Sequence, residues 1–440
     1  MLYNSMKILA LTHAHLNSEG LSPVSCERAD SVTGTWADRL GWKVDVVHTA
    51  GTKWRGIWPG GKGMKVNIIE EAPPTGLMME AQELFATALK ESLKKGRPIK
   101  AASLIVQRLR KRTRARLAAK GMADPQELVV AMKWGKYLAA SAQIQRERYD
   151  AVFACVGYGD EYLLQTAYTL SERLGLPMVV DFRDLWSGHH EAHRFTAAQR
   201  ALINKYERRL LARTVLISVP QTHMVHLLEK WVQCPVYHLM HSAYVDKRWE
   251  DGAVISNEFT MLYAGKLYPL GPGIRMLLEM VQLMAQAGMT RPFKCILHVD
   301  DPVALTRMAE EYGVTEHIEA NGWISPAELW QKIRSAHLLL IPDSGVAEDH
   351  PVVPTKTFQY AYAGRQILCL FRYMNDEMRD FLQEHHAGAV CTDASAAAKW
   401  AVDLAADAGL YRELPPLRNV PMREDVAAAY GKAVAKALGK

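Results

Sequence analysis

The start of the chain places a strand, a loop, a helix and a second strand in direct succession. The apolar segment 7–12 has the length of a buried strand, and the helical pattern of 24–40 stops at Gly41. A second apolar segment, Lys43–His48, follows. Strands joined through a helix are parallel, with a right-handed crossover. This order predicts a parallel sheet covered by helices.

The same alternation continues and forms two series of similar size. Further strands are expected at 150–156, 177–182, 214–218, 259–264, 293–299, 318–321, 336–342 and 366–371. A chain of 440 residues is also too long for one ordinary core. The fold class we expect is therefore α/β, with two Rossmann-like domains facing a cleft.

The expected domains follow from these two series. Residues 1–240 form an N-terminal domain with a basic helical insertion near 80–147, and 241–420 form the C-terminal domain. Residues 421–440 form a C-terminal helix that can return to the N-terminal domain. Ligands of open α/β sheets bind at the carboxyl ends of the strands, so the residues that follow each strand are the candidates for a site.

Cysteine usage and hydropathy restrict the compartment. The cysteines are scattered without a Cys-x-x-Cys pair, which is typical of buried thiols and not of a disulfide framework or a zinc site. They are Cys26, Cys155, Cys234, Cys295, Cys369 and Cys391. No apolar run is long enough to span a bilayer, and the first one is too short for a signal peptide. We therefore expect a cytoplasmic protein.

Residues 90–120 concentrate the positive charge of the chain. They contain twelve Lys or Arg and one acidic residue, Glu91, whereas the net charge of the whole chain is +6. Basic residues between Arg108 and Arg116 alternate with apolar ones, which predicts an amphipathic helix on an anionic membrane surface. A solvated helical face and a nucleic-acid contact are the alternatives. Of these we favour the membrane and expect no nucleic-acid partner.

Two segments of the second series suggest an anion site. Gly265 follows a strand and lets a ligand approach the backbone, and Lys266 carries a mobile ammonium suited to a diphosphate. Thr355, Lys356 and Gln359 lie at the start of a helix, where free N–H groups and the helix dipole favour phosphate. The alternative in both cases is a lysine in solvent.

A charged segment closes a strand of the first series. Asp181, Arg183 and Asp184 lie around Phe182, which suggests a polar cluster facing a ligand or an ion pair that shapes the loop. Beyond it, His189 and His193 have a spacing that can hold a metal, but no third ligand is evident. We expect no metal there and assign His189 to proton transfer or acceptor contact.

Familiar nucleotide and hydrolase signatures are absent. The sequence has no Gly-x-Gly-x-x-Gly fingerprint, no Walker loop and no Gly-x-Ser-x-Gly elbow. These absences disfavour a dehydrogenase, an ATPase and a hydrolase.

Taken together, these motifs resemble the GT-B fold glycosyltransferases, in particular the family 4, group 1 type branch of bacterial surface-polysaccharide enzymes. The matching segments are 177–186, 262–267, 321–325 and 353–360, together with the loop 17–23. The resemblance implies that Lys266 contacts the donor diphosphate and that Trp323 and Ile324 lie where the backbone holds the nucleobase. It also implies that the helix carrying Lys356 and Gln359 meets the donor sugar and ribose.

The chain departs from this family at several positions. The family commonly has two glutamates where this chain has Pro351 and Gln359. Asp300-Asp301-Pro302 replaces a glycine-rich turn, and Pro272 lies where a second basic residue is common. The resemblance implies a retaining transferase that uses a nucleotide sugar, a carbohydrate or lipid-linked acceptor, and no cofactor. Two other functions remain open, a binding protein with little or no turnover and a sugar-nucleotide epimerase.

Overall fold

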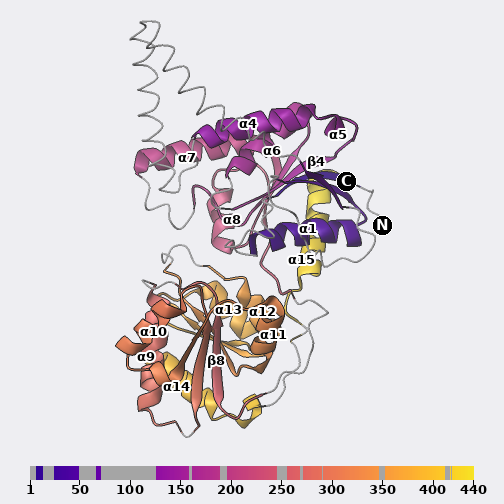
Figure 1. The fold of residues 1–440 in the computed structure, drawn as a ribbon. Coiled ribbons are helices and arrows are strands. Elements are labelled where there is room, and N and C mark those ends of the chain that lie inside the picture. The colour runs from indigo at the N-terminus through magenta and orange to yellow at the C-terminus, as the bar shows by residue number, and fades with distance from the viewer. Residues whose placement is uncertain are drawn as a thin grey trace, which may run out of the picture. The chain divides into compact units, whose positions relative to one another are not determined.

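The computed structural model describes residues 6–12, 24–48, 66–70, 125–157, 161–188, 196–244, 255–267, 271–289, 291–345, 352–411, 417 and 419–440. The chain divides into two compact units, each with its own parallel sheet (Figure 1). The first unit is Met1–Met240 with Glu424–Lys440, and the second unit is His241–Arg423.

The first unit is built on a parallel sheet with the order β3-β2-β1-β4-β5-β6-β7. Its strands are β1 (Lys7–Leu11), β2 (Lys43–His48), β3 (Val66–Glu70), β4 (Ala151–Val156), β5 (Met178–Phe182), β6 (Thr214–Val219) and β7 (Val236–His238). The central strands are buried on both faces, as expected where helices cover both sides of a sheet.

Helices cover both faces of this sheet. One face packs against α4 (Pro125–Ala140), α6 (Glu161–Leu174), α7 (Ala197–Leu210) and α8 (Thr222–Glu229), with α5 (Ala142–Gln145) after α4. The other face packs against α1 (Val24–Arg39) and the C-terminal α15 (Arg423–Ala437).

The C-terminal helix joins the first unit through an aromatic cluster. Trp36 of α1 donates a hydrogen bond from Nε1 to the Ala427 carbonyl at 3.0 Å, and its ring lies 5.1 Å from that of Trp42 and 5.5 Å from that of Tyr430. Gly431 faces Trp36 so closely that a Cβ would meet the indole at 2.7 Å. Aromatic burial of this kind holds the end of the chain in the core of the first unit.

The second unit repeats the architecture with the order β10-β9-β8-β11-β12-β13, again all parallel. Its strands are β8 (Phe259–Ala264), β9 (Phe293–His298), β10 (Ile318–Asn321), β11 (Leu338–Pro342), β12 (Gln366–Leu370) and β13 (Gly388–Cys391). Its helices are α9 (Pro272–Gln286), α10 (Pro302–Glu311), α11 (Pro326–Ser335), α12 (Lys356–Tyr362), α13 (Asp376–Glu384) and α14 (Ala394–Ala405).

Local signals explain where several of these helices begin. Ser325 caps α11 and forms a capping box with Glu328, and Pro326 occupies the first helical position. Asp301 caps α10, and Thr196 with Gln199 forms a second capping box at α7. Helices α9, α10 and α14 pack on one face of the second sheet, and α11, α12 and α13 lie on the other (Figure 1).

Both sheets change direction at the same point of their chain order. In each sheet the second and third strands lie on one side of the first strand, and the fourth strand pairs with the first on its other side. The reversal therefore falls between β1 and β4 in one sheet and between β8 and β11 in the other. This is the doubly wound order of Rossmann-like domains, and the reversal is the topological switch point where ligands of such sheets bind. The expected α/β class with two Rossmann-like domains is confirmed.

Some sequence expectations fall outside the described segments. Of the basic helical region 80–147, only the part from residue 125 onward is described, and it forms α4 and α5. The membrane-surface prediction for 90–120 lies outside the described residues. Among the helices that are described, none is both long and apolar enough to cross a bilayer.

Candidate functional site

At the switch point of the second unit, the two strands pair over a short ladder. Strand β8 pairs with β9 along its whole length, but it pairs with β11 only at Met261 and Leu262. Tyr263 and Ala264 therefore extend beyond the ladder on the β11 side. Main-chain groups released in this way need partners from elsewhere.

Lys356 of α12 supplies one of these partners. Its Nζ donates a hydrogen bond to the Ala264 carbonyl at 2.8 Å and lies 4.5 Å from the centre of the Tyr263 ring. A Cβ at residue 265 would stand only 2.4 Å from this Nζ, so Gly265 leaves the space that the ammonium occupies. The structure thus brings two predicted site residues, Gly265 and Lys356, into contact.

The charge of Lys356 is unusual for its surroundings. Burial lowers the pKa of Lys356 to about 8, and no neighbouring carboxylate offsets this effect. Within the described segments, no acidic side chain forms an ion pair with Lys356. A cation that is partly removed from water without an anionic partner is costly, so its position at a switch point favours an external anion as partner.

Lys266 borders the same switch point but is exposed. The Tyr263 hydroxyl donates to the Lys266 carbonyl at 2.8 Å, and the next amide, Leu267 N–H, donates to Asp300 Oδ1 at 2.6 Å. These bonds fix the main chain after Gly265. Tyr360 of α12 is also fully buried beside the Ala264 main chain, and burial raises the pKa of its hydroxyl.

The start of α9 contacts the end of β11, the second strand of this switch point. Gly273 N–H donates to the Asp343 carbonyl at 3.3 Å, and a Cβ at Gly273 would lie 2.0 Å from Asp343 N. This glycine therefore permits close contact between a helix and the end of β11, a role known for glycines in nucleotide-binding turns. The Asp343 carboxylate is buried and accepts bonds from Gly345 N–H and Arg372 N–H.

The interpretation of α12 as a phosphate-binding helix start needs correction. The helix has only seven residues, Thr355 before it is helical in its own backbone, and no side chain caps it. The amides of Thr357 and Phe358 already donate to the carbonyls of Pro354 and Thr355. Lys356 therefore contributes through its side chain, and the helix N-terminus offers little to a phosphate. Gln359 is half-buried on the next turn.

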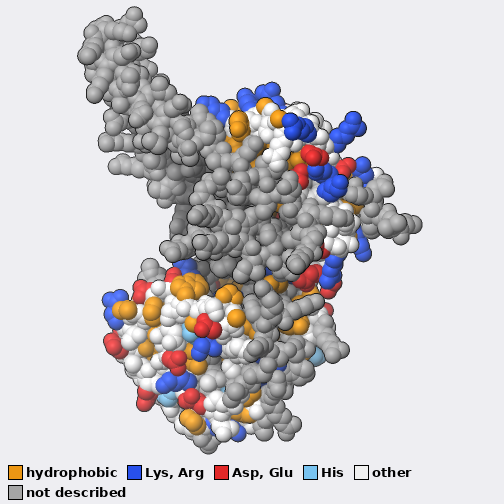
Figure 2. Space-filling model, turned by 45° about the vertical axis from the view of Figure 1, so that its right-hand side comes forward, with side chains coloured by type: hydrophobic (Ala, Val, Ile, Leu, Met, Phe, Trp, Pro, Cys, Tyr) orange, Lys and Arg blue, Asp and Glu red, His pale blue; other side chains and the backbone are white. Residues whose placement is uncertain are grey.

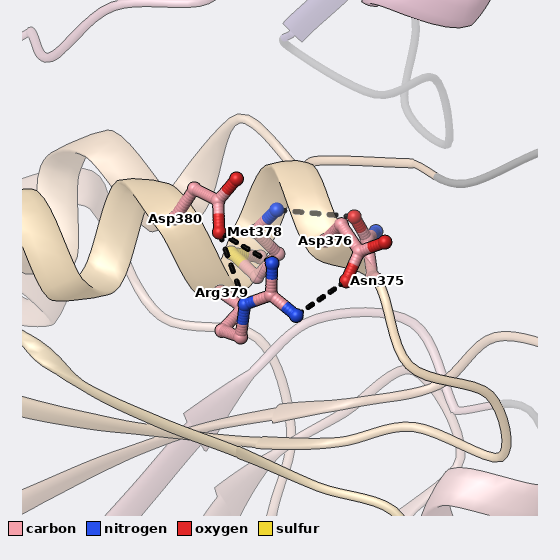
Figure 3. Close-up of polar contacts among 5 residues, drawn as sticks. All are labelled: Asn375, Asp376, Met378, Arg379 and Asp380. Atoms are coloured by element: carbon pink, nitrogen blue, oxygen red, sulfur yellow. Dashed lines mark hydrogen bonds and ion pairs between the residues drawn. The ribbon is translucent and has the colours of Figure 1, made fainter.

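Asn375 anchors the segment that leads into α12. Its Oδ1 accepts from Met378 N–H, which caps α13 (Figure 3). Its Nδ2 donates to the Val352 carbonyl at 3.0 Å. The nearby Arg379 pairs with Asp376 at 2.6 Å and with Asp380 at 2.7 Å. Those pairs are exposed and contribute little to stability. The buried Asn375, in contrast, links the start of α13 to the segment before α12.

Trp323 and Ile324 lie beyond strand β10, which β9 separates from β8. The Trp323 side chain is 69% exposed, and Ile324 is half-buried. Behind them the buried His298 ring contacts the Gly322 carbonyl through Nδ1 at 2.9 Å. The structure places these residues on the same sheet edge as Lys356 without bringing them into contact with it.

In the first unit, Asp181 lies inside the sheet and not in its loops. Its side chain is completely buried, and Oδ1 accepts from the Ser218 hydroxyl at 2.7 Å while Oδ2 lies 3.6 Å from Cys155 Sγ. These partners are the residues opposite Asp181 on the two adjacent strands. The carboxylate therefore links β4, β5 and β6 near their carboxyl ends.

Arg183 lies at the switch point of the first unit. Its amide donates to the Val156 carbonyl at 2.8 Å, and a Cβ at Gly157 would meet the guanidinium at 2.1 Å. Gly157 thus makes room for the Arg183 side chain at the end of β4. Asp184 is half-buried on the following turn, and His189 and His193 lie outside the described residues.

Glu207 supports the turn that follows β5, and no local sequence pattern marks it. Its fully buried carboxylate accepts from the Ser187 hydroxyl, and burial raises its pKa. Only the folded helix α7 brings this residue to the turn. Within the described segments, no group of three or more His, Cys, Asp or Glu is placed to hold a metal ion.

Charge is not segregated on the visible face of the second unit. On its face in Figure 2, acidic, basic and apolar side chains are interspersed. The distinguishing charge is the partly enclosed ammonium of Lys356.

Comparison with known proteins establishes the fold. No protein-family model matches the chain, and no curated protein matches it. A glycosyltransferase from Rickettsia africae is similar over 100% of both chains, with 11% identity and a TM-score of 0.62. Sucrose-phosphate synthase from Thermosynechococcus elongatus is similar over 98% of this chain and 99% of its own, with 12% identity and a TM-score of 0.56.

A third neighbour belongs to another enzyme class. A Listeria monocytogenes protein described as a UDP-N-acetylglucosamine 2-epimerase is similar over 98% of this chain and 96% of its own, with 10% identity and a TM-score of 0.55. At such low identities, likeness identifies the fold alone. That fold is the GT-B type, with two Rossmann-like domains.

Proposed function

We propose that the protein is a retaining glycosyltransferase that moves a hexosyl unit from a nucleotide-sugar donor to a polysaccharide or lipid-linked acceptor. The observation that carries this proposal is Lys356, a half-buried ammonium at the switch point, for which no described carboxylate is a partner. The diphosphate of a nucleotide sugar is an anion that matches this position.

The chemistry follows from charge on the leaving group. When the bond from the anomeric carbon to the diphosphate breaks, negative charge develops on the departing diphosphate oxygens. A preorganised ammonium in a partly enclosed site stabilises this charge more than water does. We assign this role to Lys356, with Lys266 as a second cation at the rim. These protein cations take the place of a metal ion in the proposal.

The first unit is proposed to bind the acceptor. Arg183 and Asp184 follow β5 beside the end of β4, where they can contact acceptor hydroxyls. Asp181 is proposed to fix the strands beneath them, since its carboxylate is tied to Ser218 inside the sheet. His189 remains a candidate for proton transfer.

The basic stretch 90–120 is proposed to bring the enzyme to an anionic membrane surface at the cytoplasmic side. Replacing Arg108, Arg110, Arg112 and Arg114 by Gln should weaken cosedimentation with acidic vesicles at low salt. Unchanged cosedimentation would reject this location.

Two alternatives have specific support. Pro351 and Gln359 replace the paired glutamates of the family that the chain resembles, which favours a binding protein with weak turnover. The Listeria neighbour shows that proteins described as epimerases share the fold. Product analysis by NMR distinguishes the three functions, because transfer, epimerisation and binding alone leave different sugars in solution.

A thermal-shift screen against UDP-, GDP-, dTDP- and ADP-sugars tests the proposal. A ligand at 100 times its Kd stabilises the native state by about 2.7 kcal/mol, so the cognate nucleotide sugar should raise Tm by several degrees. Lys356→Gln is the matched control, because it keeps an N–H donor for the Ala264 carbonyl but has no charge. If no nucleotide sugar shifts the wild-type protein, the proposal is rejected.

A further inference from the structure

Tyr263 contacts both lysines of the candidate donor site. Its side chain is 3% exposed, its ring centre lies 4.5 Å from Lys356 Nζ, and its hydroxyl donates to the Lys266 carbonyl at 2.8 Å. One buried aromatic side chain thus meets the ammonium of one lysine and the main chain of the other.

The two contacts have different physical effects. An ammonium over an aromatic face is attracted by the ring quadrupole, and this attraction grows when water is excluded. The hydroxyl bond fixes the main chain after Gly265 and so determines where the Lys266 side chain starts. Because the hydroxyl is anchored and the ring packs in the core of the second unit, the ring presents a fixed surface to Lys356.

Gly265 is part of the same arrangement. A Cβ at this position would stand 2.7 Å from the Tyr263 hydroxyl oxygen and 2.4 Å from Lys356 Nζ. A side chain at this position would therefore displace the lysine ammonium or the tyrosine hydroxyl from its present place. No sequence motif predicted this role for Tyr263.

We propose that Tyr263 is a positioning residue that holds Lys356 and Lys266 in place for the donor diphosphate. This inference rests on the proposed function. Tyr263 acts through the two lysines and makes no contact of its own with the reacting atoms. Its ring keeps the Lys356 ammonium at the switch point, and its hydroxyl orients the main chain of Lys266.

Two substitutions separate these effects. Tyr263→Phe keeps the ring and removes the hydroxyl, so we expect donor affinity to fall about threefold to fivefold. Tyr263→Leu also removes the ring, so we expect affinity to fall by a further factor of about five. Affinity is measured by calorimetry with UDP-glucose, GDP-mannose, dTDP-glucose and ADP-glucose, whose diphosphate diesters do not titrate near neutral pH.

The pH dependence of binding distinguishes positioning from a general loss of structure. Among the described residues, the titratable side chains near Lys356 are Tyr263, whose ring it contacts, and Tyr360, one turn along α12. Burial raises the pKa of Tyr360, so Lys356 is the group expected to lose its charge first. Removing the ring destabilises the ammonium. The midpoint at which binding weakens should therefore fall by about 0.7 pH unit in Tyr263→Leu and stay unchanged in Tyr263→Phe.

Tyr411 provides a matched control in the same unit. Its ring lies 4.0 Å from the Arg291 guanidinium, and its hydroxyl donates to the Ala405 carbonyl at 3.0 Å. Tyr411→Phe and Tyr411→Leu therefore remove the same kinds of contact away from the switch point. Both variants should leave the midpoint and the donor affinity at wild-type values.

Fluorinated phenylalanines at position 263 cover the case in which the Leu variant does not fold. They weaken the ring quadrupole stepwise at nearly constant shape, so the midpoint should fall with each added fluorine. If the wild type binds donor but the midpoint is the same across this series, the ring does not hold Lys356. If Tyr263→Phe binds as well as the wild type, the hydroxyl has no positioning role. No binding by the wild type at any pH would reject the proposed function instead.

Discussion

The two units share one strand order, yet their switch points differ. In the first unit, β1 and β4 stay paired from Ile8 to Leu11, at the carboxyl end of β1. In the second unit, β8 and β11 pair at only two positions. Topology therefore places a possible site in both units, but only the short ladder of the second unit leaves a strand-end carbonyl to the side chain of Lys356.

The buried charged groups near the carboxyl ends of the two sheets also differ. In the first unit, the buried carboxylate of Asp181 is hydrogen-bonded to Ser218 within the sheet. In the second unit, the ammonium of Lys356 contacts only a carbonyl and an aromatic ring among the described residues. This difference supports the proposed anion site in the second unit, whereas the Asp181 carboxylate already has a hydrogen-bond donor inside the first sheet.

Removing the charge of Lys356 should have the largest effect. Lys356→Gln should lower kcat/KM by about 100- to 1000-fold, equivalent to about 2.7–4 kcal/mol of transition-state stabilisation. Lys266→Ala should cost less, about tenfold, because its exposed ammonium is screened by water and salt. Steady-state kinetics with the cognate donor measures both. A larger loss for Lys266→Ala would reverse the roles assigned to the two lysines.

Glycine substitutions at the two switch points should have unequal effects on folding. Gly273→Ala places a methyl against the Asp343 backbone, which cannot move easily, so we expect a loss of about 1–3 kcal/mol in the free energy of unfolding. Gly157→Ala meets the end of the flexible Arg183 side chain and should cost much less. Urea unfolding of both variants measures the difference. Equal losses would show that the close helix–strand contact is not specific to the second unit.

Donor binding should weaken at alkaline pH. Burial lowers the pKa of Lys356 to about 8, so the ammonium loses its proton as the pH rises past that value. Affinity for a nucleotide sugar should then decline, by up to about tenfold per pH unit. Lys356→Arg keeps its charge throughout, so its affinity should stay constant between about pH 7 and pH 9. A wild-type profile as flat as that of the arginine variant would remove Lys356 from the binding step.

Gln359 should have the smallest effect. It follows Lys356 by one helical turn, so it is expected on the same face. Gln359→Glu should strengthen donor binding by about 1 kcal/mol if the side chain accepts from donor hydroxyls, and Gln359→Ala should weaken it by a similar amount. Calorimetric affinities of the two variants test this. If neither changes affinity, Gln359 is not a donor contact.

The sequence predicted the repeated elements well because each carries its own local signal. Strand β5, for example, was expected at 177–182 and is found at Met178–Phe182. Alternation along that same strand also explains the position of Asp181, since it shares a face with the buried Val179 while Phe182 joins the opposite core. The charged residues that follow it favour a loop, although the alternation along the strand already predicts a buried position for Asp181.

Other features of the site depend on contacts that no local pattern encodes. The short ladder between β8 and β11 depends on pairing between distant segments, and the short edge strands β7 and β13 lack a distinct apolar run. Glu207 reaches the turn after β5 only through the packing of α7. The sequence marks Lys356 by its place at a helix start, whereas its observed contact is with the carbonyl of Ala264 on another strand end.

Hydrogen–deuterium exchange of the full chain, with and without the cognate nucleotide sugar and without acceptor, tests the central claim most directly. If the donor binds at the switch point of the second unit, peptides covering 263–267 and 352–360 should exchange more slowly when it is present. Peptides at the end of β4, around Gly157, should be unchanged. Protection at Gly157 with none at Gly265 and Lys356 would contradict the account, because it would place the donor in the first unit.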